Sequence, residues 1–162
     1  MGVHYALIHK PQYDDCIEWI ENKNCTEERV KQGDPLSPFI FSAIMDPLLV
    51  QLEQTNGFEI DESQSISALA FADDLILLAT MKETAINLLH FTETYLNNLG
   101  MSIAAAKCTS FEIKTTDDSR YIANPGTCLK NSDKIPNWAA DSPICYLGGH
   151  ISPRSFVQSY SF

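Results

Sequence analysis

The sequence predicts an α+β fold, in which an antiparallel sheet has helices packed on one of its faces. Residues 66–71 and 75–79 are short apolar segments with only three residues between them, a spacing typical of a tight β-hairpin. Residues 37–54 and 81–99 lie on either side of this hairpin and carry apolar residues at helical spacing. Residues 114–144 are polar and rich in turn-forming residues, so no element is predicted there.

The helix predicted at about residues 37–54 has start and stop signals. Ser37 is a suitable N-cap and Pro38 suits the first helical position, whereas Asn56-Gly57 would end the element. Pro47 inside the helix should kink it or remove one backbone hydrogen bond. The apolar stripe is broad, so we expect the helix to be well buried; its members are Leu36, Ile40, Phe41, Ile44, Met45, Leu48, Leu49 and Leu52.

The hairpin leads into a second helix and then into weaker strand signals. Residues 75–79 are apolar at every position, so both faces of this strand should be covered. Thr80 and Glu83 have the spacing of a capping box, and Gly100 is a stop signal. Further strands are expected near Met101–Ile103 or Cys108–Ile113, and around Tyr146 to Ile151.

Length and composition exclude several classes of protein. The chain has 162 residues, about one domain's worth, and its 44% apolar residues suit a globular core. The longest apolar runs fall far short of the roughly 20 residues needed to cross a bilayer. Met1–Tyr5 does not begin a secretory signal. We therefore expect an intracellular, non-secreted chain without a membrane partner.

Charge and cysteine content restrict the expected partners further. Eleven Lys and Arg residues against 21 Asp and Glu residues give a formal net charge of -10. Because phosphate contacts supply most nucleic-acid affinity, the isolated chain should bind nucleic acid weakly, and only locally, through a metal or beside a basic partner. The cysteines are widely spaced without a C-x-x-C pair, which favours free thiols over a zinc site or disulfides; they are Cys16, Cys25, Cys108, Cys128 and Cys145.

The adjacent carboxylates Asp73 and Asp74 carry the main chemical signal. They repel each other and are costly to dehydrate, yet they lie between two segments that belong in a core. A divalent cation would relieve both problems, and Mg²⁺ prefers a few carboxylate oxygens together with substrate phosphates. The alternative is a solvated turn whose carboxylates bond only to the local backbone.

Four blocks in order resemble the reverse transcriptases of non-LTR retrotransposons. Residues 30–38 (VKQGDPLSP) resemble the block before the helix along the palm floor, and residues 70–74 (AFADD) the catalytic F/Y-x-D-D hairpin. Residues 99–103 (LGMSI) with Lys107-Cys108 are similar to the following block, and residues 146–148 (YLG) to the block at the base of the thumb. The resemblance implies an incomplete polymerase palm that copies RNA into DNA.

The resemblance also implies roles for individual residues. Asp73 and Asp74 would ligate Mg²⁺ or Mn²⁺ ions, two of which support nucleotidyl transfer. Lys107 would donate a proton to the departing pyrophosphate. Phe71 would pack beside the primer end, and Gln32 and Gly33 would line the template and the incoming nucleotide. The implied partners are an RNA template, a DNA primer and a dNTP, and the implied place of action is the nucleus.

The chain also departs from the family pattern. Active polymerases of this type carry another metal-binding aspartate on an upstream strand, and no such strand is predicted here. The basic fingers residues, the thumb and the endonuclease are not found, and Ala104 stands where asparagine is common. Residues 1–28 are interpreted as a remnant of the upstream fingers and palm, 29–153 as a palm fragment, and 154–162 as a tail. The chain alone is therefore expected not to polymerise.

Two alternatives to a polymerase palm are left open by the sequence. In the first, a palm-derived module without catalytic activity binds a protein partner through surface that fingers and thumb once covered. In the second, an unrelated acidic α+β domain has a plain turn at Asp73-Asp74.

Overall fold

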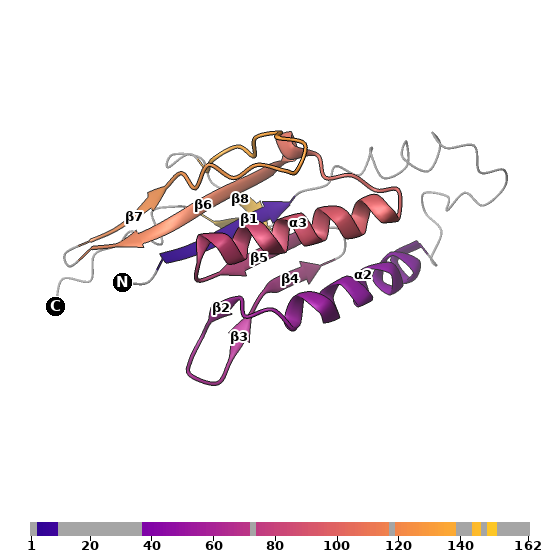
Figure 1. Ribbon diagram of the computed structural model, residues 1–162, viewed down its shortest axis with the longest axis horizontal. Coiled ribbons are helices and arrows are strands. Elements are labelled where there is room, and N and C mark those ends of the chain that lie inside the picture. The colour runs from indigo at the N-terminus through magenta and orange to yellow at the C-terminus, as the bar shows by residue number, and fades with distance from the viewer. Residues whose placement is uncertain are drawn as a thin grey trace.

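A five-stranded antiparallel sheet organises the chain in the computed structural model, which describes residues 3–9, 37–71, 74–116, 119–138, 144–146 and 149–151. The order across the sheet is β4-β5-β1-β6-β7 (Figure 1). The bounds are Ala68–Phe71 for β4, Asp74–Ala79 for β5, Val3–His9 for β1, Cys108–Thr115 for β6 and Arg120–Ala123 for β7. Two small hairpins complete the strands: Phe58–Glu59 (β2) with Ser65–Ile66 (β3), and Ile144–Tyr146 (β8) with Gly149–Ile151 (β9).

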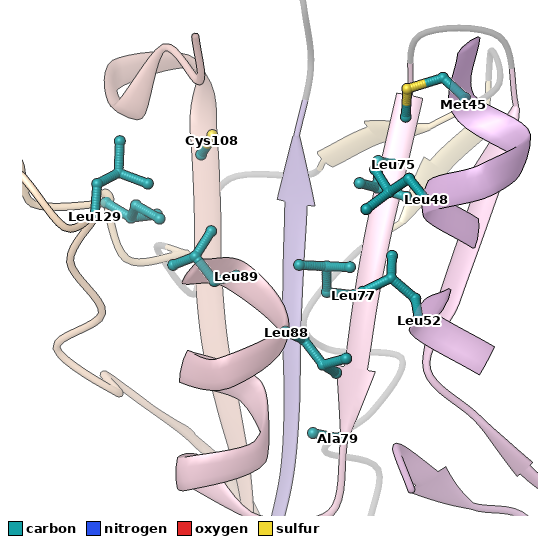
Figure 2. Close-up of a cluster of buried hydrophobic side chains, with 11 residues drawn as sticks. Met45, Leu48, Leu52, Leu75, Leu77, Ala79, Leu88, Leu89, Cys108 and Leu129 are labelled. Carbon is teal, nitrogen blue, oxygen red and sulfur yellow. The ribbon is translucent and has the colours of Figure 1, made fainter. Parts of the chain in front are cut away.

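Two helices pack against one face of this sheet, as the predicted α+β class requires. They are α2 (Ser37–Glu53) and α3 (Lys82–Asn98), and both agree with the predicted ranges to within about a residue. Leu75 and Leu77 of β5 project between the two helices (Figure 2). The buried cluster on this face consists of Met45, Leu48, Leu52, Leu75, Leu77, Ala79, Leu88, Leu89, Cys108, Leu129 and Ile135.

The predicted stop signal of α3 is confirmed in atomic detail. Gly100 has φ 77°, a left-handed conformation that glycine adopts without strain. Its N–H donates to the carbonyl of Asn97 (2.9 Å), and the N–H of Met101 donates to that of Leu96 (2.8 Å). These two bonds make a Schellman motif and satisfy carbonyls that the helix end would otherwise leave unpaired.

The predicted capping box at the start of α3 is wrong. The N-cap is Met81, and no side chain caps this helix end. The hydroxyl of Thr80 accepts a hydrogen bond from the N–H of Glu59 (3.2 Å) and donates to the carbonyl of Gly57 (3.4 Å). Thr80 therefore ties the β2–β3 hairpin to the end of β5, and that tertiary contact prevails over local capping.

The predicted strand at 66–71 belongs to two different sheets. Ile66 pairs with Phe58 in the small hairpin, whereas Ala68 pairs with Leu77 of β5. Ser67 lies buried between them. A Cβ atom at Gly57 would lie 2.5 Å from the carbonyl oxygen of Ile66 and from Cα of Ser67, so this change of sheet depends on the close approach that glycine allows.

The region after β6 is more ordered than its polar composition predicted. Of the two strand positions left open, Cys108–Ile113 is confirmed within β6, and residues 101–103 form no strand. Arg120–Ala123 adds β7, and the segment that follows it buries Leu129, Ile135 and Trp138. The carboxylate of Glu93 holds this segment by accepting the N–H of Lys130 (2.9 Å). Leu129, Ile135 and Trp138 are widely separated and show no periodicity, so the sequence alone could not predict their burial.

The expectation that α2 is well buried is only partly right. Met45, Leu48 and Leu52 are buried, but Phe39 is 73% exposed and Val50 is 55% exposed. The helix packs beside β4, the edge strand, and contacts the described part of the chain along one stripe only. Within the described ranges, no helix has the length and hydropathy that a membrane span requires.

Truncating Leu48 should destabilise the fold strongly, because its side chain is fully buried between α2 and the sheet. We expect Leu48→Ala to lower the free energy of unfolding by about 2–5 kcal/mol, the usual cost of such a cavity. Val50→Ala, on the exposed side of the same helix, should change it by less than about 0.5 kcal/mol. Denaturant unfolding of both variants measures the difference, and equal losses would contradict the observed orientation of α2.

The thiol of Cys108 should make stability fall at alkaline pH. Burial raises the pKa of Cys108 from 9.0 to about 12. Between these values the folded state keeps a proton that the unfolded state has lost, so the free energy of unfolding declines as pH rises above about 9. Denaturant unfolding at several pH values should show this slope in the parent and a smaller slope in Cys108→Ala.

Thiol labelling of the native chain gives a second measurement of the same burial. Cys108 should react at least about tenfold more slowly than the half-buried Cys128, because only the thiolate is reactive. Equal labelling rates would show that the Cys108 thiol is accessible.

Candidate active site

Three strands of the sheet reach a common end at the β4–β5 hairpin. His9 of β1 pairs with Leu75 of β5 and with Cys108 of β6. Asp74 directly precedes Leu75, and Lys107 directly precedes Cys108. Asp74 and Lys107 therefore lie at the same end of the sheet, with one strand between them and roughly 10 Å between their backbones. We call this end, with Phe71, Asp74 and Lys107, the hairpin end.

Phe71 and Asp74 project from the face of the sheet that carries no described helix. Side chains alternate along a strand, and Leu75 and Leu77 point to the helices, so Asp74 points the other way. Phe71 pairs with Asp74 and shares its face. Asp74 is half-buried and Phe71 is 63% exposed. The hairpin end thus presents a carboxylate and an accessible aromatic ring on the same face of the sheet.

The turn itself is shorter than the predicted three residues. Because Phe71 pairs with Asp74, the connection consists of Ala72 and Asp73, and Asp74 is the first residue of β5. Asp73 lies outside the described residues, as do Gln32 and Gly33. Their roles stay predictions. Figure 2 shows Met45 near Leu75 and Leu52 near Leu77, so α2 begins at the hairpin end.

Lys107 is held by a short 3₁₀ turn in front of β6. The turn spans Ala105–Lys107, and the N–H of Lys107 donates to the carbonyl of Ala104 (2.9 Å). The thiol of Cys108 donates to the same carbonyl (3.4 Å). Buried Cys108 therefore anchors the backbone beside half-buried Lys107, and Ala104 takes part in both contacts through its main-chain carbonyl.

A strand upstream of residues 30–38, which the sequence analysis did not predict, is present as β1. It occupies the middle of the sheet, between β5 and β6, and ends at the hairpin end. Its residues, Val3–His9, include neither Asp nor Glu. The run of aromatic and branched side chains is a strand signal that could have been recognised. The candidate pair Asp14-Asp15 falls outside the described residues.

Asp74 could serve as one ligand of a divalent metal, but the described residues do not supply a full set of metal ligands around it. Within the described part of the chain, no three or more His, Cys, Asp and Glu residues are grouped as a metal site. Mg²⁺ often takes only one or two protein carboxylates and completes its shell with water and substrate phosphates. A half-buried carboxylate at a strand end is compatible with that chemistry.

Comparison with known proteins adds independent information. The family model described as "Reverse transcriptase (RNA-dependent DNA polymerase)" matches residues 4–151. The match includes β1 and the β8–β9 hairpin as well as the predicted blocks. The resemblance inferred from those four blocks is therefore confirmed.

Polyproteins of retrotransposable elements are similar to the chain. The Retrovirus-related Pol polyprotein from type-2 retrotransposable element R2DM of Drosophila melanogaster is 38% identical over 141 residues, which are 86% of this chain and 13% of that protein. The one from type-1 element R2 of Popillia japonica is 42% identical over 109 residues, which are 66% and 14%. The R2 polyprotein of Nasonia vitripennis is 42% identical over 93 residues, which are 57% and 9%.

The chain thus spans about a seventh or less of these relatives' length. Nearly all of its own length, however, matches the family model, and the sheet places three of the predicted site residues, Phe71, Asp74 and Lys107, at one end. The chain belongs to the reverse transcriptase (RNA-dependent DNA polymerase) family.

Proposed function

We propose that this chain forms the palm of an RNA-directed DNA polymerase, which extends a DNA primer with dNTPs on an RNA template. The observation that carries the proposal is the hairpin end: Asp74 and Lys107 lie at the same end of one sheet, with only β1 between them, although 33 positions separate them in the sequence. Membership of the family and the similarity to R2 polyproteins support this chemistry.

Each residue of the hairpin end has a role in the proposal. Asp73 and Asp74 would hold Mg²⁺ or Mn²⁺ ions, which when bound lower the cost of the charge that develops on the phosphates. Lys107 would donate a proton to the departing pyrophosphate. Phe71, with 63% of its surface exposed on the face of Asp74, would pack against the primer end. Gln32 and Gly33 would line the template and the nucleotide.

We further propose that the 162-residue chain does not polymerise by itself. Two observations support this. Strand β1, which occupies the central position beside β5, supplies no carboxylate, so the metals lack a ligand from it. The net charge of -10 also opposes binding of a primer–template duplex. Phosphoryl transfer depends on positioning and charge stabilisation, so each missing contact lowers the rate steeply.

The nucleus is proposed as the place of action, on the basis of the family resemblance alone.

Metal binding provides a direct test of the carboxylate pair. Mg²⁺ or Mn²⁺ at about ten times its Kd should stabilise the fold by about 1.4 kcal/mol, which is a rise in Tm of roughly 3–5 °C. The Asp73→Asn/Asp74→Asn variant should lose this rise. Asp117→Asn/Asp118→Asn removes an equal charge from another Asp-Asp pair and should keep it. Thermal unfolding with and without metal measures the effect.

The control pair makes this experiment decisive. Asp117 and Asp118 follow Thr116 in the connection between β6 and β7, at the far end of β6 from Lys107. If both double variants lose the metal effect equally, or if the parent shows none, the β4–β5 turn is a solvated turn and its carboxylates do not form a metal site.

Primer extension tests activity. The purified chain with Mg²⁺ or Mn²⁺, an RNA template, an annealed DNA primer and dNTPs should give no extension above a no-protein control. Robust extension that Asp73→Ala abolishes would refute the proposed inactivity while supporting the proposed chemistry. Extension that survives Asp73→Ala would refute the assigned role of the hairpin.

A further inference from the structure

Helix α2 carries a second apolar stripe on the side that faces away from the sheet. Phe39, Ala43, Pro47 and Val50 are all exposed, and their spacing of four, four and three residues places them on one face of the helix. The buried residues Met45, Leu48 and Leu52 lie on the opposite face. Figure 1 shows α2 at the margin of the molecule, with the sheet and α3 on its inner side. We call the exposed set the outer stripe.

Within the described part of the chain, the charged residues of α2 are all acidic. Asp46 and Glu53 lie on the same outer face, are exposed, and are seven residues apart. The β2–β3 hairpin, which follows α2 in the chain, adds Glu59, Asp61 and Glu62, which are exposed as well. The sequence contains no Lys or Arg between Lys31 and Lys82, so α2 and the strands β2 to β5 contribute negative charge only.

This combination of apolar surface and one sign of charge restricts the possible occupant. Nucleic acid is disfavoured, because its phosphates would meet the carboxylates of α2, and the described part of this helix carries no Lys or Arg. A second copy presenting the same stripe would bring Asp46 and Glu53 of the two chains together, which is repulsive. A partner whose surface combines apolar side chains with Lys or Arg would match both the apolar stripe and its negative charge.

We propose that the outer stripe of α2 docks a basic amphipathic helix of a partner protein. The partner helix would place apolar residues against Phe39, Ala43 and Val50, with Lys or Arg seven residues apart facing Asp46 and Glu53. The 17 residues of α2 offer a contact line of about 25 Å, enough for several turns of a partner. The proposal concerns the face of α2 that points away from the sheet, and it does not depend on polymerase activity.

Designed peptides test the proposal on the full chain. The probes are two 18-residue amphipathic peptides with Leu at heptad a and d positions, one flanked by Lys and one by Glu. Fluorescence anisotropy should show binding of the Lys peptide, weakening with salt, and no binding of the Glu peptide. A Lys peptide of the same composition with scrambled order should bind at least about tenfold more weakly, because its apolar face is lost.

Variants of the stripe separate docking from general attraction to an acidic protein. Val50→Glu adds negative charge, so purely electrostatic binding of the Lys peptide would strengthen, whereas docking should weaken by about tenfold or more. Phe91→Glu, at a 40% exposed position of α3, is the matched control and should change the affinity less than about twofold. Asp46→Lys/Glu53→Lys should reverse the preference between the Lys and Glu peptides.

The remaining outcomes overturn the proposal. If the Lys peptide does not bind, another part of this chain covers the stripe. If sedimentation shows a concentration-dependent dimer that Val50→Glu abolishes, a second copy is the occupant. If Val50→Glu and Phe91→Glu have equal effects, the attraction is not localised on α2. Circular dichroism of each variant establishes that the fold is intact.

Discussion

Strand β5 is hydrogen-bonded along both edges and packed on both faces, and the geometry of the candidate site depends on this. Its edges pair with β4 and β1. Leu75, Leu77 and Ala79 contact the helices, whereas Ile76 packs with Phe111 and Trp138 on the other face. A register shift of one residue would exchange the two sets and turn Asp74 toward the helices. The two-sided burial of β5 thus determines the face on which Asp74 and Phe71 lie.

Charge is distributed unevenly over this framework. Lys107, Lys114 and Lys130 all come from the half of the chain that begins with α3. In α2 and the hairpins that follow it, every charged residue is Asp or Glu. Exposed charges act over about 8–10 Å at ordinary ionic strength, so a net charge of -10 does not describe any one surface. The hairpin end carries both Asp74 and Lys107, whereas the outer stripe of α2 carries apolar residues beside carboxylates. The two surfaces therefore suit different partners.

The elements that carry the candidate site could be predicted because their signals are local. The Asp-Asp turn, the apolar β5 and the Gly100 stop signal each depend on neighbours within a few residues, and the structure confirms the hairpin and the helix end. The capping box failed because the hydroxyl of Thr80 bonds to Glu59 and Gly57, which are more than 20 residues away. Trp138 and Leu129 were missed since their burial depends on contacts with β6 and α3 and not on any periodicity.

The sequence by itself determined the class of fold, the order of the main elements and the family, because apolar periodicity, turn residues and short motifs are encoded locally. Only the tertiary structure decided that β1 lies between β5 and β6, that Asp74 and Lys107 share one end of the sheet, and that half of α2 is left without a described partner. These features arise from pairings between residues far apart in the chain, and the choice of partner depends on how all the apolar surfaces are buried at once.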